Sequence, residues 1–208
     1  MKIIEIEQGS DDWKQLREGR LTGTKIGSIY AKSRKQDEMF DTSKHLLGFY
    51  ELLAERLTDS DDLSSNIERG KALESEALEV ASDELGIDFV RGNVWELDKN
   101  HIESPDGYTD DLKMAIEIKC LSSARHIQAI YEDTPPQEYA TEYANYFLVN
   151  GELEVLIVFL YDPRFINDKL RTHYWFLNRV DLMTQIRALK AVKKQVLKEL
   201  KEAEKKFA

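Results

Sequence analysis

Apolar residues follow two different periods along the chain, which divide it into a helical first part and a strand-rich second part. Ser10 and Thr22 are favourable N-cap residues, and Gly86 follows a run of helically spaced apolar positions as a C-cap. Capping and spacing together predict helices over 10–19, over 22–31, from Thr42 or Ser43 to about Leu57, and over 66–85.

After Gly86, runs of β-branched and aromatic residues between turn residues predict strands over 89–97, 102–103, 113–120, 154–161 and 172–177. The unbroken apolar run from Val155 to Leu160 predicts a strand that is buried on both faces. Two more helices are predicted, one from Pro135 or Pro136 to about Val149 and a long one over about 181–206. The fold class is therefore α+β (α/β), with helices flanking a central β-sheet.

The composition predicts one domain over residues 1–208. Of the 208 residues, 42% are hydrophobic and 33% are charged, and the chain has no internal repeat, low-complexity tract or proline- or glycine-rich linker. The single cysteine, Cys120, excludes an internal disulfide framework, a thiolate zinc site and a four-cysteine iron–sulfur cluster. With no basic leader and no apolar run of membrane-spanning length, we expect an intracellular, cytoplasmic protein.

The formal charge of −10 argues against attraction of the whole surface to nucleic acid. The charge is unevenly distributed, however. The charged residues of segment 13–35 are all basic apart from Glu18, whereas segment 58–86 is strongly acidic. The basic residues of this strip are Lys14, Arg17, Arg20, Lys25, Lys32, Arg34 and Lys35. A local basic strip on an acidic body is compatible with tracking along DNA.

Two short motifs carry the candidate chemistry. Ser104–Gly107 has the sequence SPDG, and Glu117-Ile118-Lys119 begins ten residues after Gly107. On a strand over 113–120, period-two alternation places Glu117 and Lys119 on one face, and a short hairpin brings Asp106 alongside. Carboxylate oxygens suit Mg²⁺, and a lysine ammonium beside them can orient or deprotonate an attacking water, as metal-dependent phosphodiester cleavage requires.

Each motif also has an ordinary structural interpretation. Ser-Pro-Asp-Gly is good turn chemistry, because proline presets φ and glycine accepts a positive φ. A Glu-x-Lys pair on a strand is common, and the lysines of the terminal helix are typical of a solvated face. The two motifs therefore favour a nuclease site through their order and spacing, rather than through either one alone.

Eight ordered segments add to these motifs: EQGSDDW (7–13) with LREG (16–19), LTGT (21–24), AKSR (31–34), LLAE (52–55), GKALE (70–74), SPDG (104–107), EIKC (117–120) and YDPR (161–164). With them the chain resembles the lambda exonuclease and YqaJ-like viral recombinase family of the PD-(D/E)XK nuclease superfamily. The resemblance implies a restriction-endonuclease-like fold with a central mixed β-sheet. It also implies an enzyme that digests one strand of linear duplex DNA from a 5′ end to mononucleotides, leaving a 3′ overhang for recombination.

The resemblance also implies the roles of individual residues. Asp106, Glu117 and the carbonyl of Ile118 would ligate Mg²⁺, with Mn²⁺ as an alternative and one or two ions per site. Lys119 would assist the water, and Glu74 corresponds to a helix-borne carboxylate that could bind a second metal or orient water.

A second set of residues would bind DNA. Arg17 and Thr24 match the residues that hold the 5′ phosphate, and a guanidinium fork and a hydroxyl near a helix start suit that ligand. Arg20 is a second candidate cation, and Arg34 matches a DNA-contacting arginine of an entry loop. Glu142 stands where the family usually has glutamine, so its carboxylate would either repel a phosphate or act as a partner for a metal or lysine.

The resemblance further implies a homotrimeric ring around duplex DNA, a single-strand annealing protein as partner, and a viral or prophage origin. Two alternatives stay open from the residues themselves. One is an endonuclease on the same fold, which would cut closed circles; the other is a catalytically silent DNA-binding scaffold. A helical interaction module, suggested by the terminal helix, explains none of the site residues.

Overall fold

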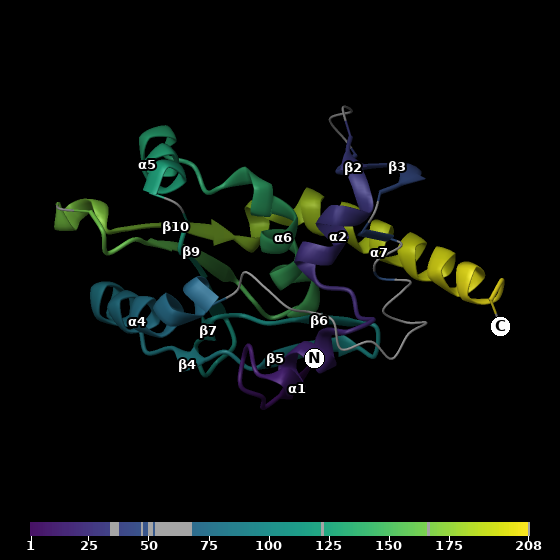
Figure 1. Ribbon diagram of the computed structural model, residues 1–208, viewed down its shortest axis with the longest axis horizontal. Coiled ribbons are helices and arrows are strands. Elements are labelled where there is room, and N and C mark those ends of the chain that lie inside the picture. The colour runs from purple at the N-terminus through teal and green to yellow at the C-terminus, as the bar shows by residue number, and fades with distance from the viewer. Residues whose placement is uncertain are drawn as a thin grey trace.

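The structure, a computed structural model, describes residues 1–33, 38–46, 48–49, 52, 68–121, 123–165 and 167–207. A sheet with the strand order β10-β9-β8-β7-β4 lies at its centre (Figure 1). Its strands are β4 (Val90–Arg91), β7 (Gly107–Tyr108), β8 (Met114–Lys119), β9 (Val155–Tyr161) and β10 (Thr172–Asn178). Strands β8 and β9 run parallel and the other neighbours antiparallel, which confirms the predicted central mixed sheet.

The alternation of β8 places its polar residues on one face, as predicted. Ile116 and Ile118 pack in a core cluster with Ala77 and Leu78 of helix α4 (Glu68–Leu85). Ala115 packs on the other face with residues of helix α6 (Ala140–Val149), the face to which Glu117 and Lys119 belong. Strand β9 is buried almost throughout because it lies inside the sheet and is covered on both faces. This confirms the prediction of a strand buried on both faces over the apolar run from Val155 to Leu160.

A second, antiparallel sheet holds the segment that leads to Asp106. It consists of β1 (Lys2–Ile4), β5 (Val94–Asp98) and β6 (His101–Glu103) in the order β1-β5-β6. The single strand predicted over 89–97 is therefore wrong, because its two ends, β4 and β5, belong to different sheets. The break comes at Gly92, whose N–H donates to the Asp106 carbonyl at 3.0 Å and where a Cβ would lie 1.7 Å from the Pro105 carbonyl oxygen.

The predicted helix start at Thr42 or Ser43 is also wrong. Residues Phe40–His45 form β3, which pairs with β2 (Tyr30–Lys32) in a two-stranded sheet. Phe40 is buried in the core, while the polar side chains that follow it leave no apolar stripe that a helix could bury. Most of the remaining stretch to Leu57 lies outside the described residues.

The other predicted helices are present with shifted ends. Helices α1 (Asp11–Arg17) and α2 (Gly23–Ile29) begin after N-cap residues Ser10 and Thr22, whose side chains accept from backbone N–H groups. The remaining described helices are α4, α5 (Ser123–Glu132), η1 (Gln137–Tyr139), α6, η2 (Asp168–Leu170), η3 (Arg179–Leu182) and α7 (Met183–Glu204). Sequence reasoning missed α5, β1 and β2. Within the described part of the chain, no helix combines the length and apolarity needed to cross a membrane.

Candidate active site

Asp106 lies against β8, as the predicted hairpin requires. It follows β6 and precedes β7, and its Oδ2 accepts a hydrogen bond of 2.6 Å from the backbone N–H of Ile118. Its Oδ1 accepts a hydrogen bond of 3.2 Å from Gln8 Nε2, so a residue near the amino terminus also fixes the carboxylate. Burial, followed by the negative charge of Glu74, raises the pKa of Asp106 to about 7.

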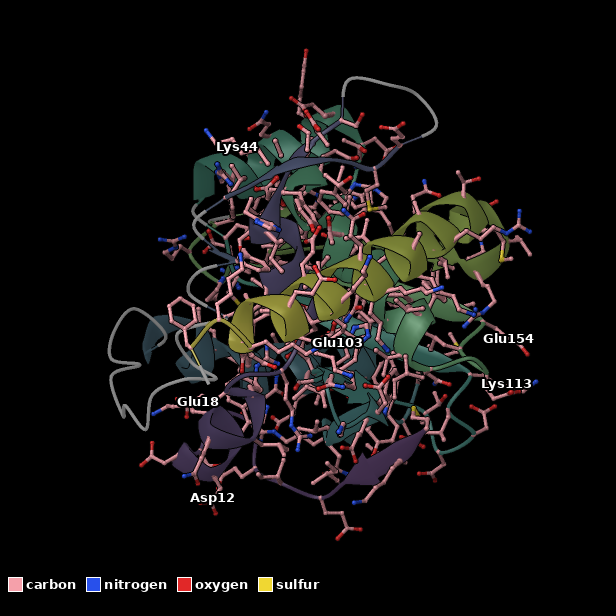
Figure 2. The ribbon with its side chains drawn as sticks, turned by 90° about the vertical axis from the view of Figure 1, so that its right-hand side faces the viewer. Asp12, Glu18, Lys44, Glu103, Lys113 and Glu154 are labelled. Carbon is pink, nitrogen blue, oxygen red and sulfur yellow. The ribbon has the colours of Figure 1, made fainter. Side chains whose placement is uncertain are left out.

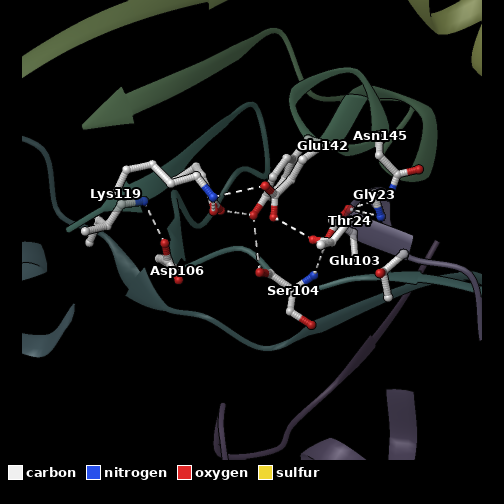
Figure 3. Close-up of polar contacts among 12 residues, drawn as sticks. Gly23, Thr24, Glu103, Ser104, Asp106, Lys119, Glu142 and Asn145 are labelled. Atoms are coloured by element: carbon white, nitrogen blue, oxygen red, sulfur yellow. Dashed lines mark hydrogen bonds and ion pairs between the residues drawn. The ribbon is translucent and has the colours of Figure 1, made fainter. Parts of the chain in front are cut away.

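Glu117 and Lys119 form a buried ion pair, and Figure 3 shows Lys119 beside Asp106. Lys119 Nζ lies 2.6 Å from Glu117 Oε1, and the Tyr146 hydroxyl donates to the other oxygen of Glu117. Burial raises the pKa of Glu117, and the Lys119 ammonium opposes that rise. Burial alone would lower the pKa of Lys119, but Glu117 and Glu142 raise it well above its usual value. Lys119 is therefore an ammonium here. We call Asp106, Glu117 and Lys119 the carboxylate–lysine cluster.

Glu74 reaches the same site from α4. It is half-buried and lines a cavity of about 850 Å³ together with Asp106, Gln8 and Arg91. Its charge contributes to the raised pKa of Asp106, so the two carboxylates lie within electrostatic reach of each other. The structure thus brings together the four residues that the sequence proposed for chemistry.

The donor chemistry of this site fits Mg²⁺. Carboxylate oxygens and the adjacent Ile118 carbonyl are the hard ligands that this ion prefers, and a cation would relieve the repulsion by which Asp106 raises the pKa of Glu117. Among the described residues, no group of three or more His, Cys, Asp or Glu side chains is already arranged to hold a metal. Both oxygens of Glu117 are engaged by protein groups, one by Lys119 and the other by Tyr146.

A second group of side chains adjoins the carboxylate–lysine cluster, and Figure 3 labels three of its members, Thr24, Ser104 and Glu142. Arg17 Nη1 donates to Ser104 Oγ at 2.9 Å, and the guanidinium stacks 4.5 Å from the centre of the Trp13 ring. Thr24 Oγ1 donates to Glu142 Oε1 at 3.2 Å. We call Arg17, Thr24, Ser104 and Glu142 the Arg17 cluster.

Of the other two predicted DNA-binding residues, the structure describes one. Arg20 forms an ion pair of 3.2 Å with Glu96 of β5. Arg34 lies outside the described residues. For Glu142, the structure shows the lysine contact that the sequence offered as one alternative, since its Oε2 lies 3.0 Å from Lys119 Nζ.

A buried polar network that sequence reasoning missed supports the Arg17 cluster. Glu103 lies inside the molecule, in contrast to the outward-pointing Asp12 and Glu18 (Figure 2), and is only 2% exposed. Its carboxylate accepts from the backbone N–H groups of Gly23 and Ser104 and from the Asn145 amide. The position of Glu103 directly before the SPDG segment was the available signal in the sequence.

His101 belongs to the same network. It is fully buried in β6, with Nε2 2.7 Å from Asn145 Oδ1. Its register in β6 turns the ring toward α6, where burial lowers the pKa of His101 to about 4.

Comparison with known proteins identifies the family. Residues 12–152 match the model of the YqaJ-like viral recombinase domain. The chain belongs to the YqaJ-like viral recombinase family. No curated protein matches the chain.

Solved structures show that this family member shares the fold of known exonucleases. An alkaline exonuclease from Laribacter hongkongensis (LHK-Exo) has 22% sequence identity and a TM-score of 0.76, over 95% of this chain and 97% of that chain. The same exonuclease in complex with dAMP gives a TM-score of 0.75 at 22% identity, with the same coverage. A phage related exonuclease from Haemophilus somnus 129PT has 12% identity and a TM-score of 0.56, over 87% of this chain and 96% of that chain.

Proposed function

We propose that the protein is a Mg²⁺-dependent exonuclease that degrades one strand of linear double-stranded DNA in the 5′→3′ direction. It would release mononucleotides and leave 3′ overhangs for single-strand annealing. The observation that carries the proposal is the convergence of Asp106, Glu117 and Lys119 beside Glu74. Family membership and the likeness of the fold to alkaline exonucleases, one of them in complex with dAMP, support it.

The chain's own residues divide the work between binding and chemistry. Asp106, Glu117 and the Ile118 carbonyl would hold Mg²⁺ or Mn²⁺, and Glu74 would serve a second ion or orient water. When bound, the metal supplies charge stabilisation for the phosphoryl group in the transition state. Lys119 donates to carboxylates as an ammonium, which favours orienting the attacking water and stabilising the phosphoryl oxygens over abstracting a proton.

The DNA end would lie against the Arg17 cluster. Arg17 and Thr24 would contact the terminal group of the 5′ strand, and Arg20 and Arg34 would contact the backbone farther along the duplex. By analogy with the family, we propose a homotrimeric ring that encloses the duplex, a single-strand annealing protein as partner, and action in the cytoplasm of a bacterial host.

The deciding experiment compares Mg²⁺-dependent digestion of linear duplex DNA with that of closed circular DNA. We expect the wild type to digest linear DNA and leave circles intact, Lys119→Ala to lose cleavage while retaining DNA binding, and a chelator to abolish the reaction. Lys113→Ala is the matched control, because Lys113 is an exposed lysine just before β8 that pairs with Glu154 (Figure 2).

Each other outcome has a definite meaning. Nicked or linearised circles would establish an endonuclease, and DNA binding without cleavage would establish a scaffold. Wild-type rates in Lys119→Ala would contradict the mechanism. A 5′ label released before a 3′ label on the same strand would establish the direction.

A further inference from the structure

Glu142 joins the two clusters through its carboxylate. Its Oε1 accepts from Thr24 Oγ1 at 3.2 Å, and its Oε2 lies 3.0 Å from Lys119 Nζ. The side chain is only 14% exposed, so solvent screens its charge weakly. A negative charge is thereby held at the point where the Arg17 cluster meets the carboxylate–lysine cluster (Figure 3).

The positive charge of Arg17 is already directed at groups of the protein. Arg17 donates to Ser104 and lies close enough to Glu103 to lower the pKa of that carboxyl, which burial and the charge of Glu142 raise. Glu103, Glu142 and Arg17 therefore share one electrostatic neighbourhood. In it, two carboxyl groups lie near one guanidinium, and one of the two, Glu142, is also paired with the Lys119 ammonium.

The two kinds of 5′ end would meet this neighbourhood differently. A terminal phosphate carries a charge of about −1.5 to −2 at pH 7 and only accepts hydrogen bonds. Beside Arg17 it would face the carboxylate of Glu142 and compete with it for the Thr24 hydroxyl. A 5′ hydroxyl is neutral and donates one hydrogen bond, which Glu142 can accept as it accepts the bond from Thr24.

We propose that Glu142 sets the end specificity of the enzyme, so that the Arg17 cluster accepts a strand with a 5′ hydroxyl at least as well as one with a 5′ phosphate. The inference rests on the proposed exonuclease function and deepens it by naming the preferred substrate end. Glu142 acts on the terminal group through charge and hydrogen bonding.

The test measures release of the first nucleotide from duplexes that differ only at the 5′ end. Only the first cut distinguishes the two substrates, because every later cut starts from the end that the previous cut leaves. The readout is kcat/KM for the phosphorylated end divided by kcat/KM for the hydroxyl end. An effect of Glu142 on Lys119 that is common to both substrates cancels in this ratio.

We expect a ratio near or below one for the wild type. Glu142→Gln keeps the size of the side chain and removes its charge, so it should raise the ratio roughly tenfold, the effect of removing one like charge at short range. Arg17→Ala in the Glu142→Gln background should return the ratio to the wild-type value. Glu138→Gln is the matched control, since Glu138 is an exposed carboxylate of η1 that pairs with Arg125, and its ratio should equal that of the wild type.

A strong phosphate preference in the wild type, or an unchanged ratio in Glu142→Gln, would overturn the proposal. If Glu142→Gln does not fold, binding decides the matter: Asp106→Asn protein in a chelator should bind phosphorylated and hydroxyl duplexes with similar Kd, and tenfold tighter binding of the phosphorylated duplex would overturn it. Failure of the wild type to cleave linear DNA would contradict the proposed function instead. Cleavage with an unchanged ratio would contradict only the role of Glu142.

Discussion

The carboxylate–lysine cluster and the Arg17 cluster lie next to each other but are built differently. Two members of the first, Glu117 and Lys119, are successive positions on one face of β8, and the third, Asp106, is hydrogen-bonded to the backbone of the same strand. The second gathers side chains from α1, α2, α6 and the segment after β6, and side-chain hydrogen bonds hold them. The groups for chemistry are thus fixed by the sheet, whereas the groups that would receive the substrate end depend on how helices pack.

This difference separates the expected effects of mutations. A change in the carboxylate–lysine cluster should remove the reaction without changing the fold, because the backbone of β8 is held by its neighbours on both sides. A change in the Arg17 cluster should alter the affinity for DNA ends and leave the chemical step in place. The largest effect on cleavage is expected for a change at Asp106, which is both a proposed metal ligand and a hydrogen-bond partner of the β8 backbone.

Asp106→Asn tests the first cluster. The amide keeps the shape of the side chain but loses the charge that would hold Mg²⁺, so we expect kcat to fall about a thousandfold, or roughly 4 kcal/mol in the activation barrier. Steady-state digestion of linear duplex measures this effect, with binding and circular dichroism run alongside. Asp110→Asn, an exposed carboxylate in the turn after β7, is the control and should retain wild-type kcat. A fall of less than tenfold in Asp106→Asn would remove Asp106 from the metal site.

Arg17→Ala tests the second cluster and should have a smaller effect. Loss of the guanidinium removes a bidentate donor for the substrate end, so we expect KM for linear duplex ends to rise about tenfold with kcat within about twofold of the wild type. Initial-rate measurements over a range of end concentrations separate the two constants. The control is Arg125→Ala, which removes an exposed arginine of α5. A loss confined to kcat would move Arg17 from substrate binding to the chemical step.

Sequence reasoning recovered the first cluster better than the second, for a physical reason. Asp106, Glu117 and Lys119 lie close in sequence, and strand alternation converts their spacing directly into a shared face. The contact between Gln8 and Asp106 joins residues 98 positions apart, and no local pattern predicts it. Ser104 was recognised only as part of a turn, because its role as acceptor for Arg17 depends on where α1 packs.

The same limit explains the errors in the fold. The split between β4 and β5 comes from the close approach of Gly92 to the carbonyl of Pro105. No periodic pattern of hydrophobic residues predicts such a tertiary contact. The hairpin of β2 and β3 is largely polar and was mistaken for a capped helix. Glu103 and His101 are polar residues in a short strand, and only the packing of α6 against β6 makes them buried.

The buried network that supports the Arg17 cluster gives the smallest effect on cleavage but a measurable effect on stability. His101 is neutral in the folded protein, since burial lowers its pKa to about 4 from an ordinary value near 6.5. The unfolded state therefore binds a proton more readily below pH 6.5. The free energy of unfolding should fall by about 3 kcal/mol, as an upper bound from this residue, as the pH drops from 6.5 to 4.

His101→Gln should flatten this dependence, because the amide can donate to Asn145 Oδ1 but does not titrate. Urea unfolding of both proteins between pH 4 and 8 measures the difference, and the two curves should run parallel above pH 7, where the histidine is neutral in both states. First-nucleotide release at pH 8 should change by less than about threefold, because the ring reaches the Arg17 cluster only through Asn145 and Glu103. Identical pH dependence in the two proteins would show that His101 takes up a proton in the folded protein as readily as in the unfolded one.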